Sequence, residues 1–450
     1  MLKTLKNTFA EIKRYPSAIV GIIIIFLMIL LAVYAVIAYP YTKAITLWRG
    51  GEDVWYMNPK YAPPAWTNWF KTEKEPVSFH VDSADGTLKK VVTNISADSN
   101  SYTFTYSFNF QADSDPQDLM LYFDNTYTAK QPFVNVSLVT PDGTNISVYQ
   151  GGASAQQNVR FTQQQKLISR FASKNRTVMQ GLFSDPKQTA IVSKKGIYQL
   201  IITGTTFEKD SDINVQFVFF GTVYGIAGTD MNRRDLMIPI LWGTPIALAF
   251  GLVGSLCTLL LTMIIAAIGS WYGGWVDSLI QRITEVNLVL PFLPILIMVG
   301  TFFSRSIWVI LGAAILLSIF TGQIKSYRAI FLQIRESGYI EAAKAYGASD
   351  FRIIFKYLIP RMIPLLIPGL VSSVPSFVFL EASLAVLGLG DPVLPTWGKT
   401  IDDAFVHGAL YKGYYYWMVE PALLLMITGL GFAMLGFALD RVFNPKLREM

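Results

Sequence analysis

The hydrophobic positions of this chain are gathered into long apolar runs. A run of about 18 or more apolar residues is long enough to cross the roughly 30 Å hydrocarbon layer of a membrane as a helix. Six such runs lie at 17–39, 238–268, 283–303, 307–324, 363–387 and 421–439. The first run is too long for the apolar part of a signal peptide, and no convincing cleavage site follows it. The pattern therefore predicts an all-α, polytopic membrane core with six transmembrane helices.

The stretch 41–227, between the first two runs, has a different pattern. Residues 101–110 read SYTFTYSFNF, so that every second side chain is aromatic and one strand face is apolar. Further short strands are predicted at 134–138, 146–148, 196–203 and 215–220, with a turn at 141–143. Several short strands joined by turns are typical of a β-sandwich. We therefore predict three parts, which are 1–40 (a tail and the first helix), 41–227 (an inserted β-sandwich-like domain) and 228–450 (the other five helices).

Composition supports the membrane assignment. Hydrophobic residues make up 52% of the 450 residues and charged residues 15%, against roughly 25% charged residues in an average soluble domain. The single cysteine, Cys257, lies in an apolar run, so no intrachain disulfide can form. We interpret the net charge of +6 as cytoplasmic Lys and Arg rather than a nucleic-acid site, because no nucleic-acid motif is found.

The basic residues also predict the orientation, since cytoplasmic loops of membrane proteins carry an excess of Lys and Arg. With six spans, the two tails and the loop between the fourth and fifth spans share one side. Their basic residues are Lys3, Lys6, Lys13, Arg14, Lys325, Arg328, Arg335, Lys344, Arg352, Lys356, Arg361, Arg441, Lys446 and Arg448. We therefore expect a plasma-membrane protein with both termini in the cytoplasm and 41–227 outside the cell. Arg233 and Arg234, just before the second span, run against this trend.

The predicted outer domain holds four Asn-X-Ser/Thr sequons, at Asn94, Asn135, Asn145 and Asn175, and the rest of the sequence has none. Such triplets are glycosylation acceptors, but they also arise often by chance. If they are glycosylated, the domain lies outside the cell.

The loop between the fourth and fifth spans holds the most informative stretch, residues 341–360, which read EAAKAYGASDFRIIFKYLIP. The sequence predicts a short helix at 339–346 that ends at Gly347, because glycine readily adopts the left-handed conformation. Ser349 is a suitable N-cap for a second helix, with Asp350 in its first turn. A helix–turn–helix element at the membrane surface is the expected result.

Two features bear on what this element does. Pro360 marks where the second helix must give way to the fifth span, because proline cannot continue the hydrogen-bond ladder. Small residues at Ala342, Ala343 and Ala345 allow the close approach of a partner protein. By spacing alone, an amphipathic linker that rests on lipid headgroups is the competing interpretation.

The same stretch resembles the coupling motif of importer permeases in the ATP-binding-cassette (ABC) superfamily. EAA, three residues, a glycine and a proline thirteen positions later match that motif. GASDFRIIFKYLIP is similar to the second (C-type) permease subunit of the dipeptide/oligopeptide/nickel subfamily. Tyr357, Ile359 and Arg361 depart from it, since Ile, Leu and Asn are usual there.

Further stretches carry the resemblance. Gly228-Thr229-Asp230 followed by Arg234-Asp235 resembles the start of the subfamily's second span, although Arg233 replaces a glycine. Asp277, Arg282, Glu285 and Pro291 resemble a pattern at the third span, with Glu for the second Asp. Residues 381–398 (EASLAVLGLGDPVLPTWG) and the ending ALDRVFNPKLRE are similar too. The resemblance is strong over 228–450, weak over 2–39 and silent on the large inserted domain.

The resemblance implies that 228–450 is an importer-permease (MetI-like) core with a cytoplasmic coupling helix at 338–350. It implies docking on an ATPase through Glu341, Ala342, Ala343, Lys344, Tyr346, Gly347, Ala348 and Ser349. The implied partners are a homologous second permease, two cytoplasmic ATPase subunits, an extracellular substrate-binding protein and membrane lipid. The partners would use ATP, and this chain would be a transport subunit, not an enzyme, that binds no cofactor itself.

The residues offer no nucleotide or metal site. Residues 398–400 read GKT, the tail of a phosphate-binding loop, but the position that should hold the first glycine is Val393. The only histidines, His80 and His407, are far apart in the chain, so no metal site is predicted. Asp402, Asp403 and Glu420 are expected to form a solvated face.

Four ionisable residues near the membrane are candidates for the pathway or a gate. Glu381, near the outer end of the fifth span, either lines the pathway or is hydrogen-bonded to the turn at 388–390. Asp277, Arg282 and Glu285 lie at the inner end of the third span. Because Arg282 and Glu285 are three residues apart, an ion pair on one helix face is expected, with a gating role as the alternative.

An aromatic run follows the first span and comprises Trp55, Tyr56, Tyr61, Trp66, Trp69 and Phe70. Aromatic side chains of this kind often form a belt at the membrane interface. A collar that packs on the inserted domain and a sugar-stacking surface are the alternatives.

These observations predict the transmembrane permease subunit of an ABC importer for short peptides. The substrate rests on the resemblance alone, so oligosaccharides and nickel stay open. Two other classes of function are kept. An ion-driven secondary transporter would need paired charged residues at mid-membrane depth. A receptor or adhesin would need only one anchoring span.

Overall fold

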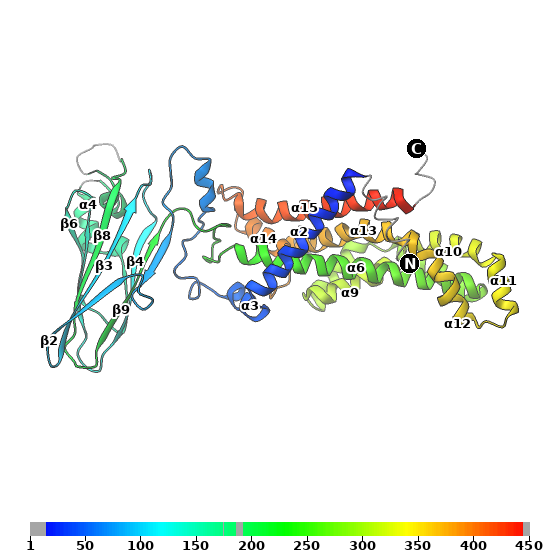
Figure 1. Ribbon diagram of the computed structural model, residues 1–450, viewed down its shortest axis with the longest axis horizontal. Coiled ribbons are helices and arrows are strands. Elements are labelled where there is room, and N and C mark those ends of the chain that lie inside the picture. Colours follow the sequence, from blue (N-terminus) through cyan, green and yellow to red (C-terminus); the bar gives the residue numbers. More distant parts are fainter. Residues whose placement is uncertain (1–14, 174, 186–191, 444–450) are drawn as a thin grey trace. The chain divides into compact units, whose positions relative to one another are not determined.

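The computed structural model describes residues 15–443, except 174 and 186–191. The basic residues Lys3, Lys6, Lys13, Arg14, Lys446 and Arg448 lie outside the described residues. The chain divides into two compact units, a β unit at Gly50–Met237 and a helical unit made of the chain on either side of it (Figure 1). The β unit begins later than residue 41, because Tyr41–Arg49 form a helix that belongs to the helical unit.

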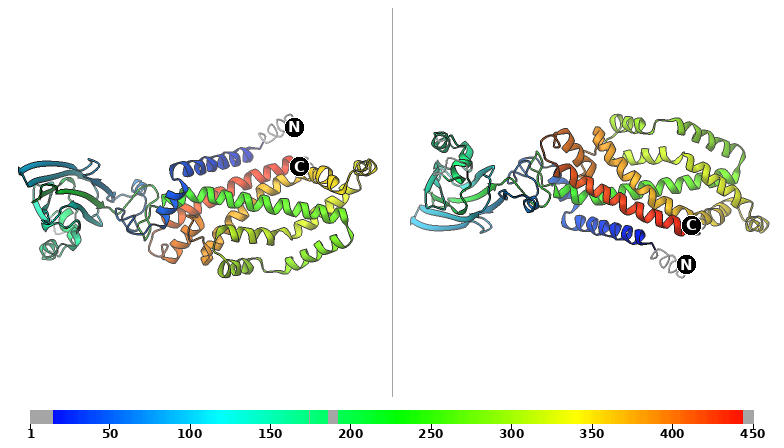
Figure 2. Two further views of the ribbon diagram at one scale, coloured as in Figure 1. Left: turned by 90° about the horizontal axis from the view of Figure 1, so that it is seen from below. Right: turned by 90° about the horizontal axis from the view of Figure 1, so that it is seen from above.

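The helical unit consists of long apolar helices and shorter connecting ones (Figure 2). Its elements are α2 (Pro16–Ala38), α3 (Tyr41–Arg49), α6 (Met237–Tyr272), α7 (Gly274–Val289), α8 (Phe292–Phe302), α9 (Ile307–Ile319), α10 (Gly322–Arg335), α11 (Gly338–Ala345), α12 (Asp350–Ile353), η3 (Ile354–Leu358), α13 (Ile359–Leu384), η4 (Ala385–Leu389), α14 (Trp397–Val406) and α15 (Tyr416–Phe443). Within the described ranges, four helices are long and apolar enough to cross a membrane, or up to six if each of two bent pairs is one span. The predicted polytopic helical core is confirmed.

The third predicted span, 283–303, is not one continuous helix. α7 ends at Val289, and α8 starts at Phe292 after a bend of 83°. Leu290 is extended (φ −68°, ψ 134°), because the ring of the following Pro291 disfavours helical geometry there. Pro291 also has no N–H to continue the hydrogen-bond ladder. The span predicted at 283–303 therefore corresponds to a bent pair of helices, and the sequence pattern did not indicate the bend because the apolar run continues through it.

The fourth predicted span is also bent, by 50°, between α9 and α10. Side chains from other elements bind both ends of α9. At its start, the N–H of Ile307 donates to Oδ2 of Asp391 over 3.0 Å. At its end, Nδ2 of Asn287 donates to the carbonyls of Leu317 and Phe320, each over 2.8 Å. These bonds satisfy backbone groups that the broken helix cannot pair itself.

Small residues bring the outer helices of this unit together. α2 packs on α15, which packs on α13 (Figure 2). A Cβ on Gly21 would lie 2.7 Å from the carbonyl oxygen of Gly431, so only glycine allows this approach. Phe26 and Leu27 of α2 are exposed and are suited to contact lipid.

The β unit contains two antiparallel sheets. Its strands are β1 (Phe79–Asp82), β2 (Lys89–Ser96), β3 (Ser99–Phe110), β4 (Asp118–Thr126), β5 (Phe133–Val139), β6 (Asn145–Gly152), β7 (Gln156–Arg160), β8 (Gly196–Thr205) and β9 (Asp212–Phe220). One sheet has the order β1-β9-β4-β7 and the other β2-β3-β8-β5-β6. Short helices η1 (Ala65–Trp69), η2 (Phe161–Gln163), α4 (Gln165–Ala172) and α5 (Val178–Phe183) lie in the connections. The predicted strands at 101–110, 134–138, 146–148, 196–203 and 215–220 are confirmed.

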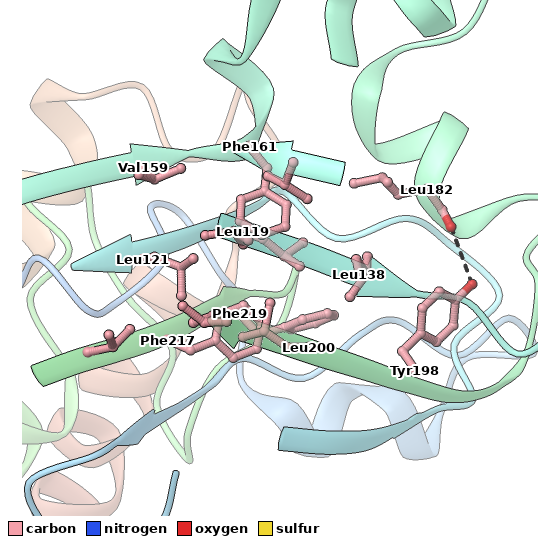
Figure 3. Close-up of a cluster of buried hydrophobic side chains, with 14 of the residues drawn as sticks. Leu119, Leu121, Leu138, Val159, Phe161, Leu182, Tyr198, Leu200, Phe217 and Phe219 are labelled. Atoms are coloured by element: carbon pink, nitrogen blue, oxygen red, sulfur yellow. Dashed lines mark hydrogen bonds between the residues drawn. The ribbon is translucent and has the colours of Figure 1, made fainter. Parts of the chain in front are cut away.

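One buried apolar cluster draws side chains from both sheets (Figure 3). Leu121 and Phe217 come from the four-stranded sheet, and Leu138 and Leu200 from the five-stranded one. The side chains that point inward alternate along each strand with others that point away, as the strand geometry requires. This shared core joins the two sheets into one unit.

The aromatic face predicted for 101–110 lies in this core. Phe104 is fully buried, and Phe108 stacks on Tyr198 with ring centroids 5.6 Å apart. The hydroxyl of Tyr198 donates to the carbonyls of Lys194 over 2.9 Å and Leu182 over 3.4 Å, the second of which is drawn in Figure 3. Burial raises the pKa of Tyr198, so the hydroxyl remains a donor throughout the usual pH range.

Part of the aromatic run after the first span packs on the β unit. Tyr56 meets Tyr122 edge to face at 4.7 Å, and Nε1 of Trp66 donates to the carbonyl of Ile226 over 2.8 Å. Trp69 and Phe70 are exposed. Tyr56 and Trp66 thus behave as the collar interpretation expects.

The ion pair of Asp142 and Lys194 yields a pH-dependent prediction. The contact with Lys194, followed by that with Thr140, holds the pKa of Asp142 well below its ordinary range. A lowered carboxyl pKa contributes stability that is complete above the ordinary pKa of about 4 and is lost as the pH falls toward the folded-state value. Asp142→Asn should therefore lower the melting temperature at pH 7, and its difference from wild type should shrink below about pH 4.

Circular dichroism of the β-sheet signal in the full chain measures this difference. Asp98→Asn, at an exposed aspartate in the turn between β2 and β3, is the control and should leave the melting temperature unchanged. A difference between Asp142→Asn and wild type that stays constant from pH 7 to pH 3 would contradict the prediction.

Candidate functional site

α11 and α12 form the helix–turn–helix element that the sequence predicts. α11 ends at Ala345, and Gly347 takes a positive φ of 74° in the turn. The hydroxyl of Ser349 accepts from the N–H of Arg352 over 3.4 Å and caps α12. The turn at Gly347 and the cap at Ser349 are confirmed.

α12 does not end before the fifth span, which corrects the role expected of Pro360. The helix continues from Asp350 to Leu389 through the π-helical turn η3. In that turn, the N–H of Ile359 donates to the carbonyl of Ile354, five residues earlier. The wider turn leaves room for Pro360, which has no N–H and would crowd a normal helical turn. α12 and α13 are thus one continuous helix.

The inner face of the α11–α12 segment rests on a buried base. Ile340 and Ile353 are buried with Phe331 of α10 in one apolar cluster. The ammonium of Lys344 lies 4.7 Å from the ring centroid of Trp271, at the end of α6. NH1 of Arg335 donates to the carbonyl of Ser270 over 2.8 Å in the same region. Ile340, Ile353 and Lys344 fix the segment to α10 and to the C-terminal end of α6, and Arg335 joins α10 to the same end of α6.

The outer face of the same segment is left open. Tyr346 is 92% exposed and Phe351 70% exposed. The rings of Phe351 and Phe355 lie 4.5 Å apart and form one apolar surface. The other predicted docking residues that are exposed are Glu341, Ala342, Lys344, Gly347 and Ser349, while Ala343 is buried and Ala348 is half-buried. Exposed aromatic side chains on a packed base are typical of a protein-docking site.

The pattern at the start of α7 holds an ion pair that the sequence analysis missed. Nε and NH2 of Arg328 donate to the two carboxylate oxygens of Asp277, over 2.7 and 2.5 Å. This two-point contact ties α7 to α10, the helix that leads into α11. The partners are far apart in the chain, so no local spacing indicated the contact. The predicted ion pair of Arg282 and Glu285 is confirmed, at 3.2 Å and exposed.

Glu381 lies inside the helical unit rather than on its surface. Its side chain is 6% exposed and faces the hydroxyl of Thr396 and the N–H of Gly398. Thr396 is the N-cap of α14, whose first N–H groups and dipole favour a carboxylate. A Cβ on Gly398 would lie 3.0 Å from Oε2 of Glu381. The contact is therefore with the start of α14, not with the turn at 388–390.

The residues at 399–403 differ from the expected solvated face. Nζ of Lys399 lies 2.9 Å from Oδ2 of Asp402 and 2.9 Å from Oδ1 of Asp403. Burial alone would lower the pKa of Lys399, but the two carboxylates outweigh it, and the pKa is raised. The lysine of the GKT triplet therefore binds its own helix. The solvated-face prediction is wrong for Asp402, which is buried.

The Gly228–Asp235 stretch explains one departure from the family pattern. Arg233, which stands where a glycine is usual, has a positive φ of 63°. Asp230 is fully buried and accepts from Nε of Arg234 over 2.5 Å. Burial raises the pKa of Asp230, and Arg234 opposes this rise. The backbone needs the conformation that glycine would supply, and Arg233 adopts it.

The other candidate residues are placed as follows. The sequon residues Asn94, Asn135, Asn145 and Asn175 all have exposed side chains on the β unit. In the part of the chain that the structure describes, no group of three or more His, Cys, Asp or Glu could hold a metal ion. His407 stacks on Trp417 with ring centroids 5.8 Å apart.

The sequence of this chain is similar to those of known membrane transport components. The family "binding-protein-dependent transport system inner membrane component" matches residues 258–449. The dipeptide transport system permease protein DppC of Bacillus subtilis is 31% identical over 223 residues, which are 49% of this chain and 69% of the relative. The oligopeptide permease OppC of the same organism is 30% identical over 227 residues, with 49% and 72% covered.

A third relative widens the set of named substrates. The glutathione transport system permease protein GsiD of Pectobacterium atrosepticum is 29% identical over 231 residues, which are 49% of this chain and 73% of the relative. The chain belongs to the family of ABC peptide-importer permeases, as a C-type subunit. The match to the family lies wholly in the C-terminal part, beyond the β unit.

The Asp277–Arg328 contact yields a prediction. Asp277→Asn should weaken the contact between α7 and α10 by about 1.5–3 kcal/mol, the typical contribution of a hydrogen bond to a charged group. Faster hydrogen exchange in α10 and α11 measures the loss. Glu285→Gln removes an exposed ion pair worth only about 0–1 kcal/mol and serves as the matched control. Equal exchange rates in the two variants would count against this role of Asp277.

Proposed function

We propose that this chain forms half of the translocation pathway of an importer for short peptides and couples it to cytoplasmic ATPase subunits. The observation that carries the proposal is the open apolar face of the α11–α12 segment on its buried base. The names of the relatives, which are permeases of dipeptide, oligopeptide and glutathione transport systems, support peptides as the substrate class.

The geometry supports a mechanical role for this segment. A docking site can transmit a movement only if it stays rigid when its partner moves. Ile340 and Lys344 hold α11 against α10 and α6, and Arg335 ties α10 to the end of α6. α12 continues without a break into α13. Closure of an ATPase dimer would move α11, and with it α13, between two arrangements of the pathway. Glu341, Ala342, Tyr346 and Gly347 would face the ATPase.

The proposed orientation follows the distribution of basic residues. The α11–α12 segment and both termini would lie in the cytoplasm, and the β unit would lie outside the cell as a β-sandwich. Two antiparallel sheets with one shared core are typical of that architecture. Exposed sequon residues are compatible with glycosylation there.

The proposed assembly contains a homologous second permease, two ATPase subunits and an extracellular substrate-binding protein. This chain would contribute no ATPase site. Lys399 of the GKT triplet is held by Asp402 and Asp403, which leaves it poorly placed to bind a phosphate. Glu381 would then serve to hold α14 against α13 rather than to line the pathway.

Three alternatives remain as outcomes of the tests. The same machinery could import oligosaccharides or nickel. An ion-driven transporter would use carboxylates exposed to an ion pathway, whereas Glu381 and Asp391 are buried against helix starts. A receptor or adhesin would need no docking surface on the α11–α12 segment, so its open apolar face would be unexplained.

Exposed residues of this face test the coupling. Tyr346→Ala should leave folding intact, because the side chain makes little contact within the chain, and should reduce ATP-driven uptake about tenfold or more by removing a central interface aromatic. Tyr411→Ala is the matched control, since Tyr411 is 94% exposed and lies outside this face. Uptake and ATP hydrolysis are measured together in proteoliposomes. Uptake at the wild-type level with Tyr346→Ala would refute the docking role.

Reconstitution tests the class of transporter. The chain should support uptake of a labelled tripeptide only with the second permease, both ATPase subunits, the binding protein and ATP. A proton or sodium gradient should not replace ATP. Uptake of a labelled maltotriose in place of the peptide would assign oligosaccharides instead. Gradient-driven uptake by this chain alone would overturn the proposal.

A further inference from the structure

A cleft of about 690 Å³ opens on the four-stranded sheet of the β unit. Its floor is the outward face of β9, β4 and β7, and Asp53, Tyr56 and Asp82 close its sides. The cleft lies wholly within the β unit. Its volume is in the range of sites that hold small molecules, which is about 300–1,000 Å³.

Strand register places a polar array on this floor. Tyr122 of β4 lies opposite Asn158 of β7 and Gln216 of β9. One step along the strand face, Asp124 lies opposite Gln156 and Asn214 in the same way. Side chains directly opposite each other in a sheet are about 5 Å apart. The floor therefore carries two neighbouring rows. In one row Tyr122 lies between two side-chain amides, and in the other Asp124 does.

Parts of this array are held in place by hydrogen bonds. Nε2 of Gln216 donates to Oδ2 of Asp82 over 2.8 Å, and its Oε1 accepts from the hydroxyl of Tyr56 over 2.8 Å. The hydroxyl of Tyr122 donates to the carbonyl of Tyr56 over 3.3 Å. Burial raises the pKa of Tyr56, and Asp82 adds to that rise, so the hydroxyl stays a donor. Tyr56 at the side of the cleft and Tyr122 on its floor thus form a fixed aromatic pair.

The charged side chains that line the cleft are all acidic. Asp53, Asp82 and Asp124 line it, and no Lys or Arg does. Within the described chain, no ion pair is found for these three aspartates. Three basic residues near the lining are paired with other carboxylates: Lys90 with Asp212, Arg160 with Asp118 and Arg233 with Glu52. Lys90 also donates to Oδ1 of Asn214 over 3.0 Å, at the edge of the cleft.

This charge favours a cationic occupant over a neutral one. The aspartates are not grouped closely enough to hold a metal ion, as judged over the residues described. An organic ammonium group needs no such compact cage, because it can donate to separate oxygens and lie against an aromatic ring. The side-chain amides of Gln216 and Asn214 are already hydrogen-bonded within the chain. Those of Gln156 and Asn158, for which no partner is found among the described residues, can pair with peptide groups that follow the ammonium.

We propose that this cleft binds the free amino end of a short peptide. The ammonium would lie among Asp53, Asp82 and Asp124 beside the two tyrosines, and the first peptide groups would lie along the amides of Gln156 and Asn158 on β7. The choice of a peptide rather than another amine rests on the proposed function, whereas the binding of an ammonium rests on the cleft alone.

Calorimetric titration of the full chain in lipid nanodiscs, without partner subunits, tests the proposal. The probes are trialanine and N-acetyl-trialanine, which differ by the charge of the amino end. Trialanine should bind, and acetylation should weaken binding about tenfold or more, as expected for the loss of a desolvated charge contact. Because no transport is measured, a failure here is separate from a failure of the proposed function.

Matched variants locate the site. Asp53→Asn combined with Asp124→Asn should also weaken trialanine binding about tenfold or more. Both aspartates are exposed, so folding should be retained and is checked by the melting temperature. The control combines Asp98→Asn with Asp210→Asn, which removes the same charge from exposed positions outside the cleft and should leave binding unchanged.

Four results would overturn the proposal. They are no binding of trialanine at millimolar concentration, equal binding of the acetylated peptide, equal losses in the cleft variant and its control, and binding of maltotriose at the same cleft in place of the peptide. The last result would assign the cleft to a neutral saccharide.

Discussion

Backbone groups inside a membrane must find hydrogen-bond partners within the protein, and the broken helices of this chain depend on that constraint. An unbroken helix meets it by itself, whereas a helix that ends at membrane depth leaves N–H and C=O groups to be paired by others. α9 is the clearest case, because Asp391 accepts from its first N–H and Asn287 donates to its last carbonyls. Glu381 does the same for the start of α14. Three polar side chains thus pair backbone groups at both ends of α9 and at the start of α14.

Sequence pattern predicted the helices well, because an apolar run of membrane length seldom occurs in a soluble domain. It also predicted the Gly347 turn and the Ser349 cap, since each depends on one residue and its immediate neighbours. It failed at one local break inside an apolar run and at one contact between distant residues. Pro291 breaks a run that stays apolar throughout, and Arg328 pairs with Asp277 across two helices. Neither the bend nor the pair produces a local periodicity in the sequence.

Some strands of the β unit were predicted from the sequence and others were not. β3, β8 and β9 carry strong apolar alternation because one face of each enters the shared core. β1, β2, β4 and β7 were not predicted. β2 exposes most of its side chains, which weakens the pattern, whereas β4 alternates buried and less buried side chains and was still missed. No pattern in the sequence predicted the cleft. Its polar residues come from separate strands and only the sheet register brings them together.

The π-helical turn η3 sets a rotational relation between two faces of one helix. Each residue of an α-helix advances the side-chain direction by about 100°, so the extra residue of a π-helical turn shifts everything beyond it by nearly that angle. Ile353, before the turn, and Met362, after it, are both buried in the same apolar cluster. Shortening the turn by one residue would keep the composition of the helix but aim its two ends at incompatible neighbours. The direction in which side chains point around this helix, more than their hydrophobicity, therefore connects the α11–α12 segment to the membrane-spanning helices.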